Sequence, residues 1–166
     1  MDAENSMYLD QLDADQVSAA LDADPIMTAN SDLENVLRPI VDSAPDRGIE
    51  DLKVIIVDRD PLEPTALRDF ANEIVADTGG TVIVRAPFSV ASSSDSHPRA
   101  ALEIAQYEMM DDPSDYPEGF NLFIDEVTDY TVPFFDYALI AGGAIAIVFA
   151  CLAAYWWVRS HGRRAN

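Results

Sequence analysis

The chain has 166 residues, with 30 Asp and Glu against 10 Lys and Arg, and a formal net charge of −20 at pH 7. This length fits one domain, and a hydrophobic fraction of 49% is enough for a folded core. Because so negative a surface repels phosphate backbones, nucleic acid is excluded as the expected partner, and cations or basic proteins are favoured. The single cysteine, Cys151, excludes a disulfide within the chain.

Residues 1–30 form an acidic N-terminal segment that we expect to be partly mobile. The apolar residues 17–21 within it suggest a short edge strand. From residue 31 to residue 131 apolar residues recur with helical and strand spacing in alternation, which predicts a soluble α/β domain.

The first helix of this domain is expected from residue 31 onward. Ser31 and Glu34 have the spacing of a capping box, in which each side chain satisfies a free backbone N–H of the first turn. Pro39 lacks an N–H and is expected to kink or split the helix, and Gly48 is expected to end it.

Residues 52–57 are almost continuously apolar, as in a strand covered on both faces. An amphipathic helix with an apolar stripe between residues 67 and 75 follows, and residues 81–85 form the next strand. Strand, helix and strand in this order predict a right-handed βαβ unit with parallel strands. Pro87 then turns the chain, and residues 89–93 are expected to return as an antiparallel edge strand.

Two further helices are predicted over residues 99–110 and around residues 120–127, separated by an acidic loop. The expected fold class is therefore α/β. It is a small, three-layer-like module with a mixed, mainly parallel sheet, made of one βαβ unit and an edge hairpin, and followed by one C-terminal transmembrane helix.

The transmembrane helix is predicted over residues 134–158, because residues 137–158 carry no charge and span roughly 30 Å as a helix. Aromatic residues flank both ends, and residues 159–166 form a short basic tail. The positive-inside rule favours a plasma-membrane protein with its soluble domain outside the cytoplasm and its C-terminus inside. A tail anchor with a cytosolic domain is the alternative, because the N-terminus has no signal-peptide pattern.

Small residues recur every four positions in this apolar segment, which would let a second helix approach closely. They are Ala138, Gly142, Ala146, Ala150 and Ala154. The pattern suggests helix–helix association in an oligomer or in a larger membrane complex.

No catalytic or cofactor site is predicted. The turn after the first strand, residues 58–63, contains prolines and acids but no glycine, so it cannot cradle a phosphate. Ser92, Asp95 and His97 offer the residue types of a catalytic triad, but neighbours in one polar loop rarely adopt its geometry. We expect a solvated loop there.

Carboxylates could bind Ca²⁺, although none of the acidic clusters has the spacing of a dedicated calcium loop. Asp58 and Asp60 are candidates because ligands gather at the carboxyl ends of strands in open α/β sheets. The acidic loop adds Asp111, Asp112 and Asp115. A solvated acidic face is the simpler interpretation of both groups.

The central part of the sequence has a D-L-K strand that ends in V-D, a T-x-L-R-D helix start, and a T-V-x-V strand followed by P and S. The positions are Asp51, Lys53, Val57, Asp58, Thr65, Leu67, Arg68, Asp69, Thr81, Val82, Val84, Pro87 and Ser89. Together with the apolar C-terminal segment ending in arginines, this pattern resembles a family of small single-pass membrane proteins of mycobacteria and corynebacteria.

The resemblance implies genes beside those of NlpC/P60 peptidoglycan hydrolases. It also implies a domain distantly similar to the TPM domain, an α/β module with Ca²⁺ binding in some members and a disputed phosphatase activity. The acidic, glycine-containing motif of the TPM metal site is not found in this sequence.

We therefore expect a membrane-anchored acidic interaction or regulatory module of the cell envelope, which acts through protein partners and not by catalysis. The expected protein partner is an envelope hydrolase or a larger membrane complex. The alternatives are an accessory subunit of an integral-membrane complex and a divalent-cation-dependent phosphatase of the TPM type.

Overall fold

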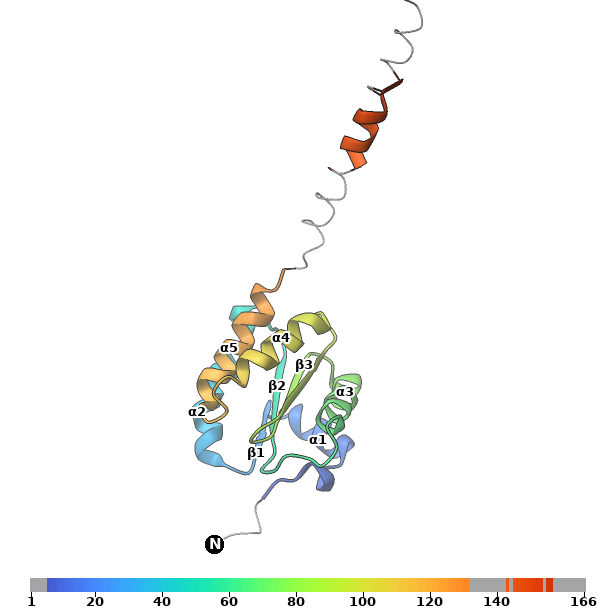
Figure 1. Cartoon of the computed structure of the whole chain (residues 1–166). Coiled ribbons are helices and arrows are strands. Elements are labelled where there is room, and N and C mark those ends of the chain that lie inside the picture. Colours follow the sequence, from blue (N-terminus) through green and yellow to red (C-terminus); the bar gives the residue numbers. More distant parts are fainter. Residues whose placement is uncertain (1–5, 132–142, 144, 154, 157–166) are drawn as a thin grey trace, which may run out of the picture. The chain divides into compact units, whose positions relative to one another are not determined.

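The computed structural model describes residues 6–131, 143, 145–153 and 155–156. The chain divides into two compact units, Met1–Tyr130 and Thr131–Asn166. The elements of the first unit are, in chain order, the 3₁₀ helix η2 (Leu9–Gln11), α1 (Ala14–Leu21), β1 (Ile26–Thr28), α2 (Ser31–Ser43), the 3₁₀ helix η3 (Pro45–Arg47), β2 (Leu52–Ile56), α3 (Ala66–Thr78), β3 (Thr81–Arg85), β4 (Val90–Ser94), α4 (Arg99–Met109) and α5 (Tyr116–Asp129) (Figure 1).

Across the described residues the strands form one sheet in the order β1-β2-β3-β4. β1, β2 and β3 are parallel, and β4 is antiparallel to β3. Every residue of β2 and β3 is buried, which explains their nearly continuous apolar sequences. The prediction of an α/β fold with a mixed, mainly parallel sheet is confirmed, including the βαβ unit and the edge hairpin; β1 was not predicted.

Helices cover both faces of the sheet, so the first unit has three layers (Figure 1). Residues of α2, α4 and α5 pack on one face, where Phe120, Phe123 and Ile124 are fully buried. Residues of α1 and α3 pack on the other, with Ile74 fully buried. Alternate residues of β2 point to opposite faces of the sheet, so Val54 packs in the first core and Ile55 in the second.

The two helical crossovers have opposite hands. Both connections, β1-α2-β2 and β2-α3-β3, advance by one strand in the same direction, yet α2 and α3 lie on opposite faces. The usual right-handed rule can therefore hold for only one of the two. The helices that follow the neighbouring strands β1 and β2 therefore leave the carboxyl ends of these strands toward opposite faces, although the strand order does not reverse there.

Three local expectations were wrong. Residues 17–21 belong to helix α1, whose Val17 and Leu21 are buried on one side of the helix. Asn30 and not Ser31 caps α2, because its side chain accepts hydrogen bonds from the backbone N–H groups of Asp32 and Leu33. The expected split of α2 at Pro39 does not occur: the helix continues to Ser43, and Pro39 lies on its exposed side, where the unmatched carbonyl one turn earlier can bind water.

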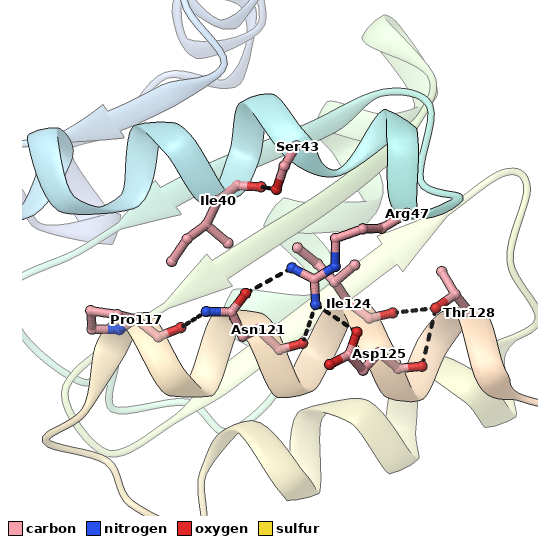
Figure 2. A network of polar contacts seen from close by, with 8 residues as sticks. All are labelled: Ile40, Ser43, Arg47, Pro117, Asn121, Ile124, Asp125 and Thr128. Carbon is pink, nitrogen blue, oxygen red and sulfur yellow. Dashed lines mark hydrogen bonds and ion pairs between the residues drawn. The ribbon is translucent and has the colours of Figure 1, made fainter.

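Arg47 fixes the end of this crossover to α5, as Figure 2 shows. Its guanidinium donates to the Asn121 side chain at 2.7 Å, to the Asn121 carbonyl at 3.0 Å and to Asp125 at 2.6 Å. Gly48 then reverses the chain with a φ of 109°, a left-handed conformation that favours glycine. The helix α2 itself ends at Ser43, before the predicted position. Gly48 instead ends the short 3₁₀ helix η3 that follows it.

In the second unit the described residues 143, 145–153 and 155–156 are helical. Their large apolar side chains are exposed: Ile145, Ile147, Val148, Phe149, Leu152, Tyr155 and Trp156. No helix of the described residues is long and apolar enough to cross a membrane. The prediction of a C-terminal transmembrane helix is therefore wrong as part of the fold class, since no helix in the described part of the chain could span a bilayer. The rest of segment 134–158 and the tail 159–166 lie outside the described residues.

Candidate functional site

A groove of about 510 Å³ lies at the carboxyl end of β2. This volume falls in the range of about 300–1,000 Å³ that is usual for ligand sites. One wall is the segment between β2 and α3 together with the first turns of α3, and the other is the N-terminal segment around Tyr8. The lining residues are Tyr8, Leu9, Asp10, Arg59, Asp60, Pro61, Leu62, Glu63, Ala66, Asp69, Phe70 and Glu73.

Asp58 fastens the N-terminal wall to the sheet. The Met7 N–H donates to the Asp58 carboxylate, and the Asp58 N–H donates to the Met7 carbonyl at 2.8 Å. Above this pair the Arg59 guanidinium lies 4.8 Å from the centre of the Tyr8 ring and 3.7 Å from a carboxylate oxygen of Asp10. The groove therefore depends on contacts between residues about 50 positions apart in the sequence.

Asp60 fastens the opposite rim to the β3–β4 turn. Its carboxylate accepts hydrogen bonds from the Phe88 N–H at 3.1 Å and from the Ser89 hydroxyl. Thus both candidate metal ligands of this edge, Asp58 and Asp60, hold loops in place through hydrogen bonds to neutral donors.

The groove is lined by both apolar and acidic side chains. Leu9, Leu62 and Phe70 contribute apolar surface, and Leu62 is fully exposed. Five carboxylates and one guanidinium line the same space. A ligand with both apolar and cationic groups would match this arrangement in shape and in charge.

The second group of candidate metal ligands shapes the loop between α4 and α5. Asp112 accepts hydrogen bonds from the N–H and hydroxyl of Ser114, which hold the pKa of its carboxyl below the usual value. Asp115 caps α5 by accepting from the Glu118 N–H at 3.0 Å, and Asp111 follows the last turn of α4. In the part of the chain that the structure describes, no group of three or more His, Cys, Asp or Glu could hold a metal ion. Calcium binding by these residues stays a prediction.

Arg85 is the residue that the sequence analysis missed. It ends β3 and is completely buried, with its guanidinium 4.0 Å from the centre of the Tyr116 ring and donating to the Pro113 carbonyl at 3.0 Å. Its Nε and Nη1 have no hydrogen-bond partner in the described residues. Burial lowers the pKa of this guanidinium. The available signal was a charged residue at the end of an otherwise apolar strand.

Ser92, Asp95 and His97 do not combine into one site. Ser92 accepts a hydrogen bond from Gln106 at 2.7 Å, and the backbone N–H of His97 donates to Ser94 at 3.1 Å. The carboxylate of Asp95 accepts instead from the Gly80 N–H at 3.1 Å. Ser92 and His97 do line a smaller hollow between β4, α3 and α4, together with two arginines.

The sequence profile of the family described as Membrane protein Rv1476 matches residues 7–166 of the chain. The chain belongs to the Rv1476 membrane protein family. A relative of the same description from Mycobacterium tuberculosis (strain ATCC 25618 / H37Rv) is 41% identical over 71 residues, which make up 42% of this chain and 38% of the relative. The matched region thus spans well under half of the relative's length. No solved structure matches the chain.

Membership of the Rv1476 family confirms the resemblance to mycobacterial membrane proteins. The TPM-like relationship and the gene neighbourhood stay predictions, as does the side of the membrane on which the first unit lies. Of the small-residue stripe, Ala146 and Ala150 are exposed residues of the described helical stretch. Ala138, Gly142 and Ala154 lie outside the described residues.

Proposed function

We propose that this Rv1476-family protein is a membrane-associated acidic module that binds a basic, amphipathic segment of a protein partner in the groove at the carboxyl end of β2. It acts by binding and not by catalysis. The observation that carries the proposal is the combination of apolar and acidic side chains in the lining of one groove of about 510 Å³.

Charge complementarity favours a basic protein segment as the occupant. A peptide with alternating apolar and cationic faces would bury Leu62 and Leu9 and place its Lys or Arg side chains near Glu63, Asp69 and Glu73. The net charge of −20 would also speed the encounter with a basic partner at low salt and repel acidic competitors.

Two observations support an association with the membrane. The family to which the chain belongs is one of membrane proteins. In addition, apolar side chains such as Phe149 and Trp156 are exposed in the second unit, and exposed apolar surface of this kind marks contact with a membrane or a partner. The second observation also suits an accessory subunit of an integral-membrane complex, which is our second candidate.

A direct binding test uses the full chain in a nonionic detergent and a fluorescent peptide of alternating Lys and Leu with helical spacing. The triple variant Glu63→Gln, Asp69→Asn and Glu73→Gln should bind it about tenfold more weakly, since each exposed charge pair contributes at most about 1 kcal/mol. The matched control is Asp32→Asn, Asp42→Asn and Glu50→Gln, which removes the same charge from exposed positions outside the groove. Equal losses in both triple variants would show that only net charge matters and would refute the groove.

A cellular test places a photo-crosslinking side chain at Leu62, and for comparison at Val36, which is 49% exposed on α2. A specific crosslinked protein is expected only from residue 62, and it should disappear in the groove triple variant. Crosslinks that persist in that variant would contradict the proposal. Hydrolysis of a phosphomonoester by the purified chain with Ca²⁺ or Mg²⁺ would instead favour the enzymatic alternative.

A further inference from the structure

A second hollow lies where β4 meets α3 and α4. None of its lining residues also lines the groove at the carboxyl end of β2. Its lining combines the charged side chains of Arg68, Arg99 and Glu103 with neutral polar groups such as Ser92 and Gln106. Its volume is about 120 Å³. This is well below the range of about 300–1,000 Å³ for sites that enclose a drug-sized ligand, so the hollow fits one small chemical group.

The charge of this hollow is opposite to that of the whole chain. Arg68 and Arg99 converge on it from α3 and α4, and His97 lies in the turn that precedes α4. Glu103 is the only carboxylate in the lining. On a chain with a formal charge of −20, the described residues thus place a local excess of cationic groups in one concave surface.

One carboxylate, Glu103, contacts both guanidiniums. An oxygen of Glu103 lies 2.7 Å from Arg99 Nε and 3.5 Å from Arg68 Nη2. The hydrogen bond from Arg99, followed by its charge, lowers the pKa of the Glu103 carboxyl. All three side chains are between 41% and 71% exposed, so they can rearrange without disturbing the core.

Neutral hydrogen-bonding groups complete the hollow. Ser92 is 7% exposed and accepts a hydrogen bond from Gln106 Nε2 at 2.7 Å, which leaves its own O–H to point to a second acceptor. Ser93 and Asn72 lie on the same lining. Hydroxyl and amide donors beside two guanidiniums suit an oxyanion with several acceptor oxygens better than a flat carboxylate.

We propose that this hollow binds the phosphate group of a small ligand, and that the phosphate displaces Glu103 from Arg68 and Arg99. A phosphate dianion offers more charge and more acceptor oxygens than the carboxylate it replaces, which makes the exchange favourable. Glu103 then acts as an internal competitor that occupies the guanidiniums until a phosphate arrives. This site is independent of the groove at the carboxyl end of β2.

The exchange predicts opposite effects for the two kinds of residue. The test is isothermal titration of the full chain in a nonionic detergent with inorganic phosphate. Glu103→Gln should bind phosphate about tenfold more tightly than the wild type, because the competing charge is removed. Arg68→Gln and Arg99→Gln should each bind it about tenfold more weakly, because each loses a charge-assisted contact.

The controls replace one arginine and one glutamate by glutamine in the groove at the carboxyl end of β2. Arg59→Gln and Glu73→Gln alter the net charge in the same two directions but line the other site, so they should stay within about twofold of the wild type. No phosphate binding by wild type and Glu103→Gln, or equal shifts at Arg59 and Arg99, would overturn the proposal.

Two further arms identify the source of the phosphate. Glycerol 3-phosphate represents a soluble ester, and phosphatidic acid in phosphatidylcholine vesicles represents a lipid headgroup. Whichever binds must show the same order of affinity, with Glu103→Gln above the wild type and Arg99→Gln below it. Binding to either that is insensitive to these changes counts against the hollow as the site.

Discussion

The two ends of the sheet each bury one cation and stabilise it in different ways. At the amino end of β2, Lys53 is 4% exposed and forms an ion pair with Asp51. At the carboxyl end of β3, Arg85 is 0% exposed, donates to a backbone carbonyl and lies over the rings of Tyr116 and Phe120. Lys53 thus has a carboxylate in direct contact, whereas Nε and Nη1 of Arg85 have no hydrogen-bond partner in the described residues.

Each cation also depends on a glycine, though for different reasons. A Cβ on Gly80 would lie 2.5 Å from the Asp51 carbonyl oxygen and 2.8 Å from its carboxylate, so this glycine lets the acid approach Lys53. A Cβ on Gly119 would lie 2.8 Å from Arg85 Nη1, so that glycine makes room for the guanidinium. The comparison teaches that a buried cation can be stabilised by an ion pair or can be packed without one. The free energy of unfolding should therefore respond differently to substitution at the two ends.

The largest effect is expected from Gly80→Ala at the amino end. The residue has a φ of +77° and would meet the Asp51 backbone, which cannot move away as a flexible side chain can. We expect the free energy of unfolding to fall by about 3 kcal/mol, measured by urea denaturation of the full chain followed by circular dichroism. Gly79→Ala is the matched control, since Gly79 also has a positive φ of +68° but its Cβ would meet only the Asp95 side chain at 3.2 Å, so it should lose less; equal losses would show that the approach of Asp51 is unimportant.

A smaller loss is expected from Asp51→Ala. It leaves Lys53 buried without its partner, and because Asp51 itself is 52% exposed we expect about 2 kcal/mol and not the 3–5 kcal/mol of a fully buried pair. The adjacent Glu50→Ala removes the same charge from an exposed position and should change stability by less than about 0.5 kcal/mol. Adding Lys53→Met to Asp51→Ala should restore most of the loss; failure of this rescue would mean that the ion pair is not the cause.

The sequence predicts the elements of this sheet best where the signal is strong and local. The runs at residues 52–57 and 81–85 have a single reasonable interpretation, and the structure confirms both as strands in a βαβ unit. β1 was missed because it has three residues and is defined only by pairing with β2. The segment 17–21 is too short to distinguish strand from helix by periodicity, and its burial against α3 decided the outcome.

The candidate site was less predictable because its residues meet only in three dimensions. Asp58 and Asp60 were placed correctly at the carboxyl edge by topology, but their hydrogen bonds to Met7 and to the β3–β4 turn have no signature in the sequence. The convergence of Arg68 and Arg99 likewise depends on how α3 and α4 pack against β4. The transmembrane prediction is contradicted on another ground: among the residues that the structure describes, no helix is long and apolar enough to cross a membrane.

The smallest effect is expected at the carboxyl end, from Arg85→Met. The two guanidinium nitrogens without hydrogen-bond partners in the described residues, Nε and Nη1, cost desolvation free energy that an apolar side chain of similar length would not, while the new side chain keeps the contacts with Tyr116 and Phe120. Stability should therefore stay within about 1 kcal/mol of the wild type, or rise. Arg47→Met is the matched control and should cost more, because the Arg47 guanidinium makes three hydrogen bonds to Asn121 and Asp125. If Arg85→Met were the more harmful of the two, the buried guanidinium would have to be held in solution by a counter-charge, for which Asp112 and Asp115 are the nearby groups, and the contrast between the two ends of the sheet would disappear.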